Sequence, residues 1–287
     1  MEVTCILPAH NEAQAIGALL GRIAKANSSW KILVVDDGST DGTAEAARGA
    51  GAQVLSHPYR KGNGAAVKSG LRAARTDYVV LLDSDGQHPP EKIPDLLAKA
   101  RSHELVVGAR TGKRPGGLHR RIANGIYNVL ASYVSGSRIP DLTSGFRVFH
   151  RKTVLRYLYL FPNTFSYPTT STLAFLKSGR SVAFVPFEAA ERRGASKISL
   201  LSDGVRFLLT IFRIAVMFSP IRIFFPLSLA MFGGGAVYLG VHIARYHTFP
   251  PAALFLLSTG VLIFVLGLIS EQIAQLRLAF TEEREDE

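Results

Sequence analysis

Short apolar blocks and longer mixed blocks alternate along the first half of the chain. The apolar blocks are largely apolar on both faces, which favours buried strands. These predicted strands are Val3–Leu7, Lys31–Val35, Gln53–Leu55, Tyr78–Leu82 and Leu105–Val107. The blocks between them have helical composition and are Ala13–Ala26, Thr43–Ala50, Ala65–Ala74 and Pro90–Arg101. Because strands and helices alternate, we expect an α/β domain whose mostly parallel sheet has helices on both faces.

The pattern becomes less regular beyond residue 110. Ile122–Ser135 has the composition of a helix and Val182–Phe187 that of a strand. Lys113–Gly117 is rich in Gly, Pro and basic residues, which predicts a mobile surface loop.

Two long uncharged runs follow, Phe224–Ala244 and Thr248–Ser270. A helix needs about 20 apolar residues to cross a bilayer, so we predict two transmembrane helices; a pair of buried core helices is the alternative. The preceding segment Ser199–Ser219 is apolar, but Arg206 and Arg213 are seven residues apart and share one helical face. This predicts an amphipathic helix in the membrane interface, with a core helix as the alternative.

These patterns divide the chain into four parts. We expect a catalytic domain over 1–198, an interface helix over 199–221, a two-helix transmembrane region over 222–273 with spans at about 224–244 and 251–271, and an acidic tail over 274–287. The segment before the first span is rich in Lys and Arg, and Met1–Leu7 lacks the features of a signal peptide. The positive-inside rule then predicts that the catalytic domain and both termini are cytoplasmic.

The composition narrows the class of partner. The formal net charge is +11, which would suit nucleic acid, but beside two spans it is more simply explained by anionic lipid headgroups and phosphate-bearing substrates. We therefore expect no nucleic-acid partner. Cys5 is the one cysteine, which excludes a disulfide framework within the chain and predicts a buried thiol.

Polar motifs follow three of the predicted strands. They are Pro8–Glu12, Asp36–Thr43 and Asp83–His88. In parallel sheets, ligands bind beyond the carboxyl ends of the strands, so the three acidic loops are expected to converge on one edge.

Asp83 and Asp85 are the candidates for a metal site. Two carboxylates one residue apart, after a buried strand, can direct oxygen ligands from a rigid edge, and Gln87 can add a carbonyl oxygen. Hard cations such as Mg²⁺ or Mn²⁺ favour these ligands. Asp36 and Asp37 are suited to accept hydrogen bonds from a base or ribose; a solvated turn with helix caps is the alternative reading of their motif.

Six ordered motifs resemble the family 2 inverting glycosyltransferases, which have a GT-A (Rossmann-like) fold. The motifs are Ile6–Glu12, Val34–Thr43, Lys61–Ala66, Leu82–Pro89, Asp141–Arg147 and Arg192–Lys197. The last two narrow the resemblance to the dolichyl- or polyprenyl-phosphate sugar synthases, which include dolichol-phosphate mannosyltransferases. It covers about the first 220 residues and extends loosely to the two spans.

The resemblance implies a role for each matching residue, although a tyrosine more often stands at the place of His10. The implied donor-binding residues are Pro8, His10, Glu12, Asp36, Asp37, Lys61 and Asp83, and the metal ligands are Asp83, Asp85 and Gln87. Near the acceptor phosphate it implies Arg110, Arg120, Asn124, Arg193 and Ser196, and as catalytic residues Asp85, Asp141, Arg192 and Lys197. Arginine forks and a lysine just before an interface helix are also suited on chemical grounds to phosphate at membrane level, the alternative being a solvated basic loop.

The implied reaction moves a hexose from GDP- or UDP-hexose to a polyprenyl or dolichyl phosphate, with mannose and glucose favoured by the resemblance. The acceptor phosphate is already largely dianionic at neutral pH, so one displacement inverts the anomeric centre without a strong base. Asp141 would then orient the acceptor or hold the loop that contains Arg147. The alternatives are a sugar hydroxyl as acceptor, with Asp141 as base, and a non-enzymatic tether. A monomer and a homo-oligomer both stay open.

Overall fold

The computed structural model describes residues 1–111, 118–163, 166–188, 212–213 and 215–282, with only the backbone described at 118–124 and 280–282. The chain divides into two compact units. One comprises Met1–Ser132 and Ser137–Lys197, and the other comprises Tyr133–Gly136 and Ile198–Glu287.

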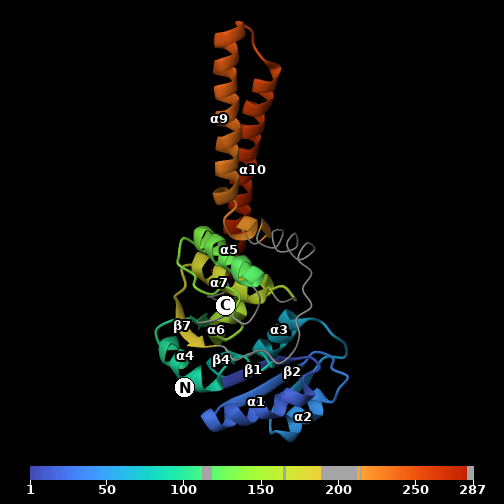
Figure 1. The fold of residues 1–287 in the computed structure, drawn as a ribbon. Coiled ribbons are helices and arrows are strands. Elements are labelled where there is room, and N and C mark those ends of the chain that lie inside the picture. Colours follow the sequence, from blue (N-terminus) through green and yellow to red (C-terminus); the bar gives the residue numbers. More distant parts are fainter. Residues whose placement is uncertain (112–117, 164–165, 189–211, 214, 283–287) are drawn as a thin grey trace. The chain divides into compact units, whose positions relative to one another are not determined.

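The first unit is built on a seven-stranded sheet with the order β3-β2-β1-β4-β6-β5-β7 (Figure 1). Its strands are β1 Val3–Ala9, β2 Lys31–Asp36, β3 Gln53–Ser56, β4 Tyr78–Leu81, β5 Leu105–Thr111, β6 Arg147–His150 and β7 Val182–Glu188. Neighbouring strands are parallel except at β6, which runs antiparallel to both β4 and β5. The predicted α/β class and mostly parallel sheet are confirmed.

Helices cover both faces of this sheet. The helices before the C-terminal hairpin are α1 Ala13–Ala26, α2 Thr43–Gly49, α3 Asn63–Ala73, α4 Ile93–Ala100, α5 Leu118–Ser135, α6 Arg151–Arg156 and α7 Tyr167–Lys177, with short 3₁₀ turns at Pro90–Lys92 and Leu158–Leu160. Cys5 and Leu7 lie in one core cluster with residues of α1 and α4. Alternate strand residues point to opposite faces, and Ile6 meets α3 on the other side. A Cβ on Gly70 of α3 would lie 2.4 Å from Ile6 Cγ2, so this glycine permits close helix-sheet packing.

The predicted elements occur at nearly the predicted positions. The α1 helix has the predicted bounds, and α5 begins four residues earlier than expected, at Leu118. Cys5 is buried, as expected of a thiol in the first strand, and burial raises its pKa to about 12. Strand β6 and helices α6 and α7 were not predicted. The expected loop Lys113–Gly117 lies outside the described residues.

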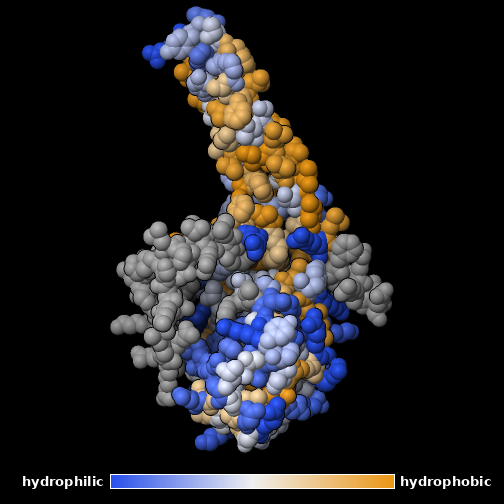
Figure 2. All heavy atoms as spheres, turned by 90° about the vertical axis from the view of Figure 1, so that its right-hand side faces the viewer, coloured by the Kyte–Doolittle hydropathy of each residue, from blue (hydrophilic) through white to orange (hydrophobic). Residues whose placement is uncertain are grey.

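The second unit contains a helical hairpin of α9, Ile221–Tyr246, and α10, Pro251–Glu282. Both helices are long and apolar enough to cross a membrane, with mean hydropathies of 1.6 and 2.6. Glycines bring them close together, because a Cβ on Gly260 would lie 2.8 Å from the backbone nitrogen of Phe232. Most of their other apolar side chains face outward, as the orange surface of the hairpin in Figure 2 shows. Core helices of a soluble protein would instead be mostly buried.

The hairpin helices are longer than the predicted spans. The α9 helix begins at Ile221 instead of about 224, and α10 continues to Glu282, so most of the expected 274–287 tail is helical. Glu271 Oε2 accepts a hydrogen bond of 3.2 Å from the backbone N–H of Ile221 and thereby caps the start of α9. Of the interface helix predicted over 199–221, residues 199–211 and 214 lie outside the described residues.

Candidate active site

The three acidic loops meet at one edge of the sheet. Strands β1, β2 and β4 are mutually parallel, so the loops after Ala9, Asp36 and Leu81 all leave the same edge. Strand β5 runs in the same direction and ends near Arg110. Because β6 runs the opposite way, the loop that precedes it, Asp141–Phe146, enters at this edge as well. The convergence of the three loops expected from the sequence is present, and the loop before β6 joins them at the same edge.

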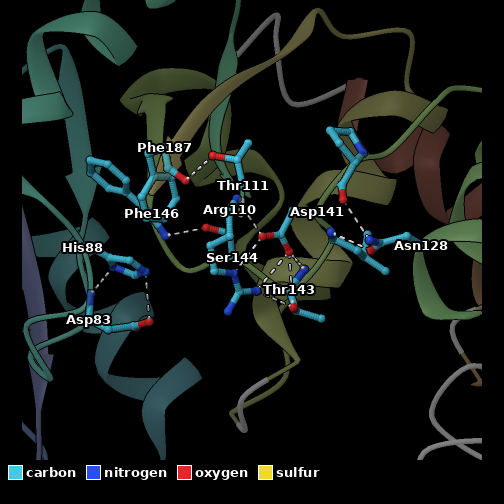
Figure 3. A network of polar contacts seen from close by, with 12 residues as sticks. Asp83, His88, Arg110, Thr111, Asn128, Asp141, Thr143, Ser144, Phe146 and Phe187 are labelled. Carbon is cyan, nitrogen blue, oxygen red and sulfur yellow. Dashed lines mark hydrogen bonds and ion pairs between the residues drawn. The ribbon is translucent and has the colours of Figure 1, made fainter. Parts of the chain in front are cut away.

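Asp83 is supported from behind by a buried histidine (Figure 3). The backbone N–H of Asp83 donates to His88 Nδ1 at 3.0 Å, so the neutral ring carries its proton on Nε2, which lies 3.6 Å from Asp83 Oδ2. Burial lowers the pKa of His88 to about 4. The imidazole stacks on Phe146, with ring centroids 5.3 Å apart. The Asp83 side chain itself remains 35% exposed, which leaves it accessible to a ligand.

The Asp141–Phe146 loop presses against Asp83 at Gly145. A Cβ placed on Gly145 would lie 2.7 and 2.8 Å from the two carboxylate oxygens of Asp83. A side chain at this position would therefore displace the carboxylate. Neither His88 nor Gly145 received a role from the sequence, where only their places within polar motifs distinguish them.

An ion pair between Arg110 and Asp141 forms the wall beside Asp83 (Figure 3). Arg110 donates from Nε to Asp141 Oδ2 at 2.7 Å and from Nη2 to Oδ1 at 2.9 Å, and its backbone N–H also reaches Oδ2. Thr143 Oγ1 accepts a further bond of 2.7 Å from Nη2. Burial acts to lower the pKa of Arg110, but Asp141, Asp83 and Asp85 outweigh it and raise the pKa above its ordinary value.

The Asp141 carboxylate is saturated with hydrogen bonds. Its side chain is 1% exposed, and the backbone N–H of Thr143 adds to the three donors of Arg110. A carboxylate has about four lone-pair positions, so no acceptor position remains for a substrate proton. Asn128 of α5 fixes the same segment, since its side chain bonds the carbonyl of Pro140 and the N–H of Leu142 at 2.8 and 3.0 Å. The geometry suits Asp141 to hold Arg110.

The two adjacent aspartates after β2 have different surroundings. Asp37 is buried, and its carboxylate accepts bonds of 2.8 Å from His57 Nδ1 and from the backbone N–H groups of Lys61 and Gly62. Burial acts to raise the pKa of Asp37, but these bonds outweigh it and lower the pKa below its ordinary value. The Asp36 carboxylate accepts a hydrogen bond of 3.1 Å from the backbone N–H of Ser39.

Asp37 therefore fastens the segment 57–62 to the end of β2. Gly38 assists, because its φ is +70° and a Cβ there would lie 2.6 Å from the carbonyl carbon of Tyr59. His10 Nδ1 donates to the carbonyl of Asp37 at 3.1 Å, which joins the first loop to the second. The capping alternative holds for Asp41, whose carboxylate accepts from the N–H groups of Ala13 and Thr43 at 3.1 Å each.

The other predicted site residues vary in how far the structure describes them. Pro8 is buried in β1, Glu12 precedes α1, Lys61 is exposed beside the Tyr59 ring, and Gln87 donates its backbone N–H to Asp85 Oδ1 at 3.1 Å. Arg120 and Asn124 lie on α5, but their side chains are outside the description. Arg192, Arg193, Ser196 and Lys197 lie wholly outside the described residues. Their roles stay predictions.

The donor set at Asp83 and Asp85 suits a hard divalent cation. Over the described residues, no group of three or more His, Cys, Asp and Glu side chains could hold a metal by itself. Two carboxylates with the nearby Gln87 amide match Mg²⁺ or Mn²⁺, which usually take their remaining ligands from water and substrate phosphates.

Solved structures share this fold. A glucosyl-3-phosphoglycerate synthase from Mycobacterium tuberculosis in complex with phosphoglyceric acid superposes with a TM-score of 0.61 at 22% identity, covering 75% of this chain and 80% of that one. The same enzyme with Mn²⁺ and UDP-glucose gives 0.58 at 24% identity, covering 73% and 78%. The first unit thus has a GT-A-like fold.

The sequence comparisons identify the family. Residues 4–158 match glycosyl transferase family 2, and residues 219–276 match the GtrB C-terminal hairpin. The undecaprenyl-phosphate mannosyltransferase of Micrococcus luteus is 31% identical over 69% of this chain and 88% of its own. The undecaprenyl-phosphate 4-deoxy-4-formamido-L-arabinose transferase of Salmonella choleraesuis is 30% identical over 70% of this chain, which spans 63% of that relative. The chain belongs to glycosyl transferase family 2, as the motifs indicated, and is an enzyme.

The environment of Asp37 generates a pH-dependent prediction. Asp37→Asn should lower the free energy of unfolding at neutral pH by about 2 kcal/mol, because three donors lose a buried anionic acceptor. The folded pKa is lowered, so this contribution is present above the unfolded pKa of about 3.9 and is lost as the pH falls through the folded pKa. Thermal unfolding of wild type and variant should therefore differ at neutral pH and converge in acid.

Asp95→Asn is the control, because Asp95 is an exposed carboxylate paired with Lys92 at 2.9 Å. It should change stability by less than about 0.5 kcal/mol. A gap between wild type and Asp37→Asn that stays constant into strong acid would contradict the assignment.

Proposed function

We propose that this enzyme transfers a hexose from a nucleotide-sugar to a polyprenyl phosphate in the membrane, with inversion at the anomeric carbon. The observation that carries the proposal is the presence, in one chain, of the carboxylate edge and an outward-facing apolar hairpin of the GtrB type. The two relatives named above act on different sugars, but both are named for undecaprenyl phosphate. Both names therefore support the polyprenyl phosphate acceptor, and mannose or glucose carried by GDP or UDP follows from the motif resemblance.

Asp83, Asp85 and Gln87 are suited to hold Mg²⁺ or Mn²⁺ at the donor diphosphate. When bound, such a cation supplies Lewis-acid stabilisation of the negative charge on the departing nucleotide. His88 and Gly145 confine the Asp83 carboxylate from two directions. That confinement keeps Asp83 oriented before the donor arrives, so little reorganisation is needed during the reaction.

Arg110 provides a permanent positive charge beside these carboxylates. Asp141 and Thr143 hold three of its donors, and its side chain remains 22% exposed. A guanidinium fixed in this way is suited to attract the acceptor phosphate toward the donor. The phosphate is largely dianionic at neutral pH and attacks without transferring a proton to the protein.

The hairpin accounts for access to a lipid acceptor. Placed in a bilayer, α9 and α10 satisfy their backbone hydrogen bonds internally and expose apolar side chains to lipid. The excess of basic residues before α9 orients the catalytic unit and both termini toward the cytoplasm under the positive-inside rule. Arg192, Arg193, Ser196 and Lys197, with Arg120 and Asn124, are proposed to meet the acceptor phosphate at membrane level.

The first test is direct. Purified full-length protein in detergent, given Mn²⁺ or Mg²⁺, undecaprenyl phosphate and a panel of labelled GDP- and UDP-hexoses, should form an acid-labile lipid product of inverted anomeric configuration. Chelation with EDTA and the variant Asp85→Asn should abolish the product, whereas Asp95→Asn should not. Undecaprenol, which lacks the phosphate, should be inert. Folded protein that forms no lipid product from any donor would overturn the proposal.

A second test separates phosphate from hydroxyl acceptors. If Asp141 only holds Arg110, Asp141→Asn should lower kcat by less than the 10²- to 10⁴-fold typical of a lost general base, at about 10-fold. Arg110→Lys, which breaks the same bidentate pair, should produce a loss of similar size. Loss of turnover by about 10⁴-fold in Asp141→Asn, with donor binding intact and Arg110→Lys active, would favour a sugar hydroxyl as acceptor and Asp141 as its base.

A further inference from the structure

Arg147, the first residue of β6, is a fully buried cation. Its relative exposure is 0%, and the acceptors of its hydrogen bonds in the described part of the chain are neutral groups. Nε donates to the carbonyl of Ser144 at 2.7 Å, and Nη2 donates to the carbonyl of Leu142 at 3.0 Å. Nη1 donates to the hydroxyls of Ser171 and Thr172, at 3.0 and 2.7 Å. The guanidinium therefore bridges the Asp141–Phe146 loop and helix α7.

The charge of Arg147 persists despite its burial. Burial lowers the pKa of Arg147 to about 10, so the group is still protonated at neutral pH. Within the described part of the chain, no carboxylate forms an ion pair with it, although Asp141 and Asp83 act on it at longer range. Taking an unpaired charge out of water is costly. Hydrophobic packing alone gives no reason for an arginine at this position.

Successive residues of the loop that Arg147 binds contact two different arginines, Arg147 and Arg110. Arg147 holds the backbone carbonyls of Leu142 and Ser144, whereas the side chains of Asp141 and Thr143 hold Arg110. The next residue is Gly145, at which any Cβ would lie within 2.8 Å of both carboxylate oxygens of Asp83. The position of this loop therefore determines the positions of the Asp83 carboxylate and the Arg110 guanidinium.

Helix α7 provides a rigid base for the bridge. Ser171 and Thr172 are both 0% exposed. Each hydroxyl donates to the carbonyl of Pro168, at 3.1 and 3.0 Å, which leaves its oxygen lone pairs directed to Arg147. Two hydroxyls fixed on one buried helix thus transmit its position to the loop through a single planar guanidinium.

We propose that Arg147 is a positioning residue that sets the Leu142–Gly145 segment against Asp83 and thereby shapes the site for the divalent cation and the donor diphosphate. This inference rests on the proposed role of Asp83. The planar fork of the Arg147 guanidinium, which connects α7 to two loop carbonyls, positions the segment; the positive charge alone does not. A lysine keeps the charge but cannot reach all four acceptors.

The test measures Mn²⁺ binding by electron paramagnetic resonance in the full-length protein, with UDP and with GDP, so neither the sugar nor the lipid needs to be known. Arg147→Lys should weaken Mn²⁺-nucleotide binding by at least about tenfold, as typically follows from loss of a group that orients metal ligands. The paired change Ser171→Ala with Thr172→Val, which keeps Arg147 and removes its anchor on α7, should weaken binding in the same direction.

Val154→Ala is the control for a simple loss of stability. Val154 is buried on α6. Its replacement by alanine should lower the midpoint of thermal unfolding without changing the affinity for Mn²⁺ and nucleotide. Unchanged affinity in Arg147→Lys, or a loss that Val154→Ala matches at an equal midpoint, would overturn the positioning role while leaving the proposed function intact. If the wild-type protein fails to bind Mn²⁺ in the presence of either UDP or GDP, both the positioning role and the proposed function are overturned. If Arg147→Lys does not fold, the Ser171/Thr172 pair decides by the same criteria.

Discussion

The bidentate ion pair between Arg110 and Asp141 joins parts of the catalytic unit that the chain alone would leave apart. Arg110 closes strand β5, and Asp141 opens the loop that leads into the antiparallel strand β6. The pair is largely buried, so each charge depends on the other: removing one partner of such a pair typically costs about 3–5 kcal/mol, because the remaining charge stays desolvated. Since Asp83 also acts electrostatically on Arg110, the pair shapes the side of the proposed site that lies next to this carboxylate.

A balance of charge runs through the whole edge. Asp83, Asp85 and Asp141 supply three negative charges, and Arg110 and Arg147 supply two positive ones from nearby positions. These five groups sum to one negative charge, so a bound divalent cation would make the edge positive and favourable to a phosphate-bearing ligand. Low-dielectric surroundings strengthen each of these interactions relative to water. The neutral state of buried His88 is consistent with this balance, because a protonated His88 would compete with a bound metal ion for the Asp83 carboxylate.

Much of the fold follows from local pattern, and the exceptions have physical causes. Apolar blocks mark six strands, helical composition marks five helices, and the two uncharged runs near the C-terminus mark α9 and α10. Strand β6 has only four residues and begins with an arginine, which apolar periodicity cannot distinguish from a loop. Helix α7 contains Thr169, Thr170, Ser171 and Thr172, which look exposed in sequence but are buried.

The sequence predicted many residues of the candidate site, but it did not predict which residues they contact. Motif resemblance brought out Asp83, Asp85, Arg110 and Asp141, but residues 31 positions apart reveal no pairing until the sheet brings them together. The division of labour between Asp36 and the buried Asp37 likewise depends on the segment 57–62, which is distant in sequence. Side-chain chemistry is legible from sequence, whereas saturation of a carboxylate by particular donors requires the tertiary structure.

A double-mutant cycle across the Arg110–Asp141 pair tests the central claim most directly. It compares kcat/KM for undecaprenyl phosphate in Arg110→Ala, Asp141→Ala and the double variant. If Asp141 acts through Arg110, kcat/KM of the double variant should be no lower than that of the less active single variant. The coupling free energy between the two substitutions should then be at least about 1 kcal/mol. Losses that simply add would contradict this account, because they would mean that the two residues serve the reaction independently.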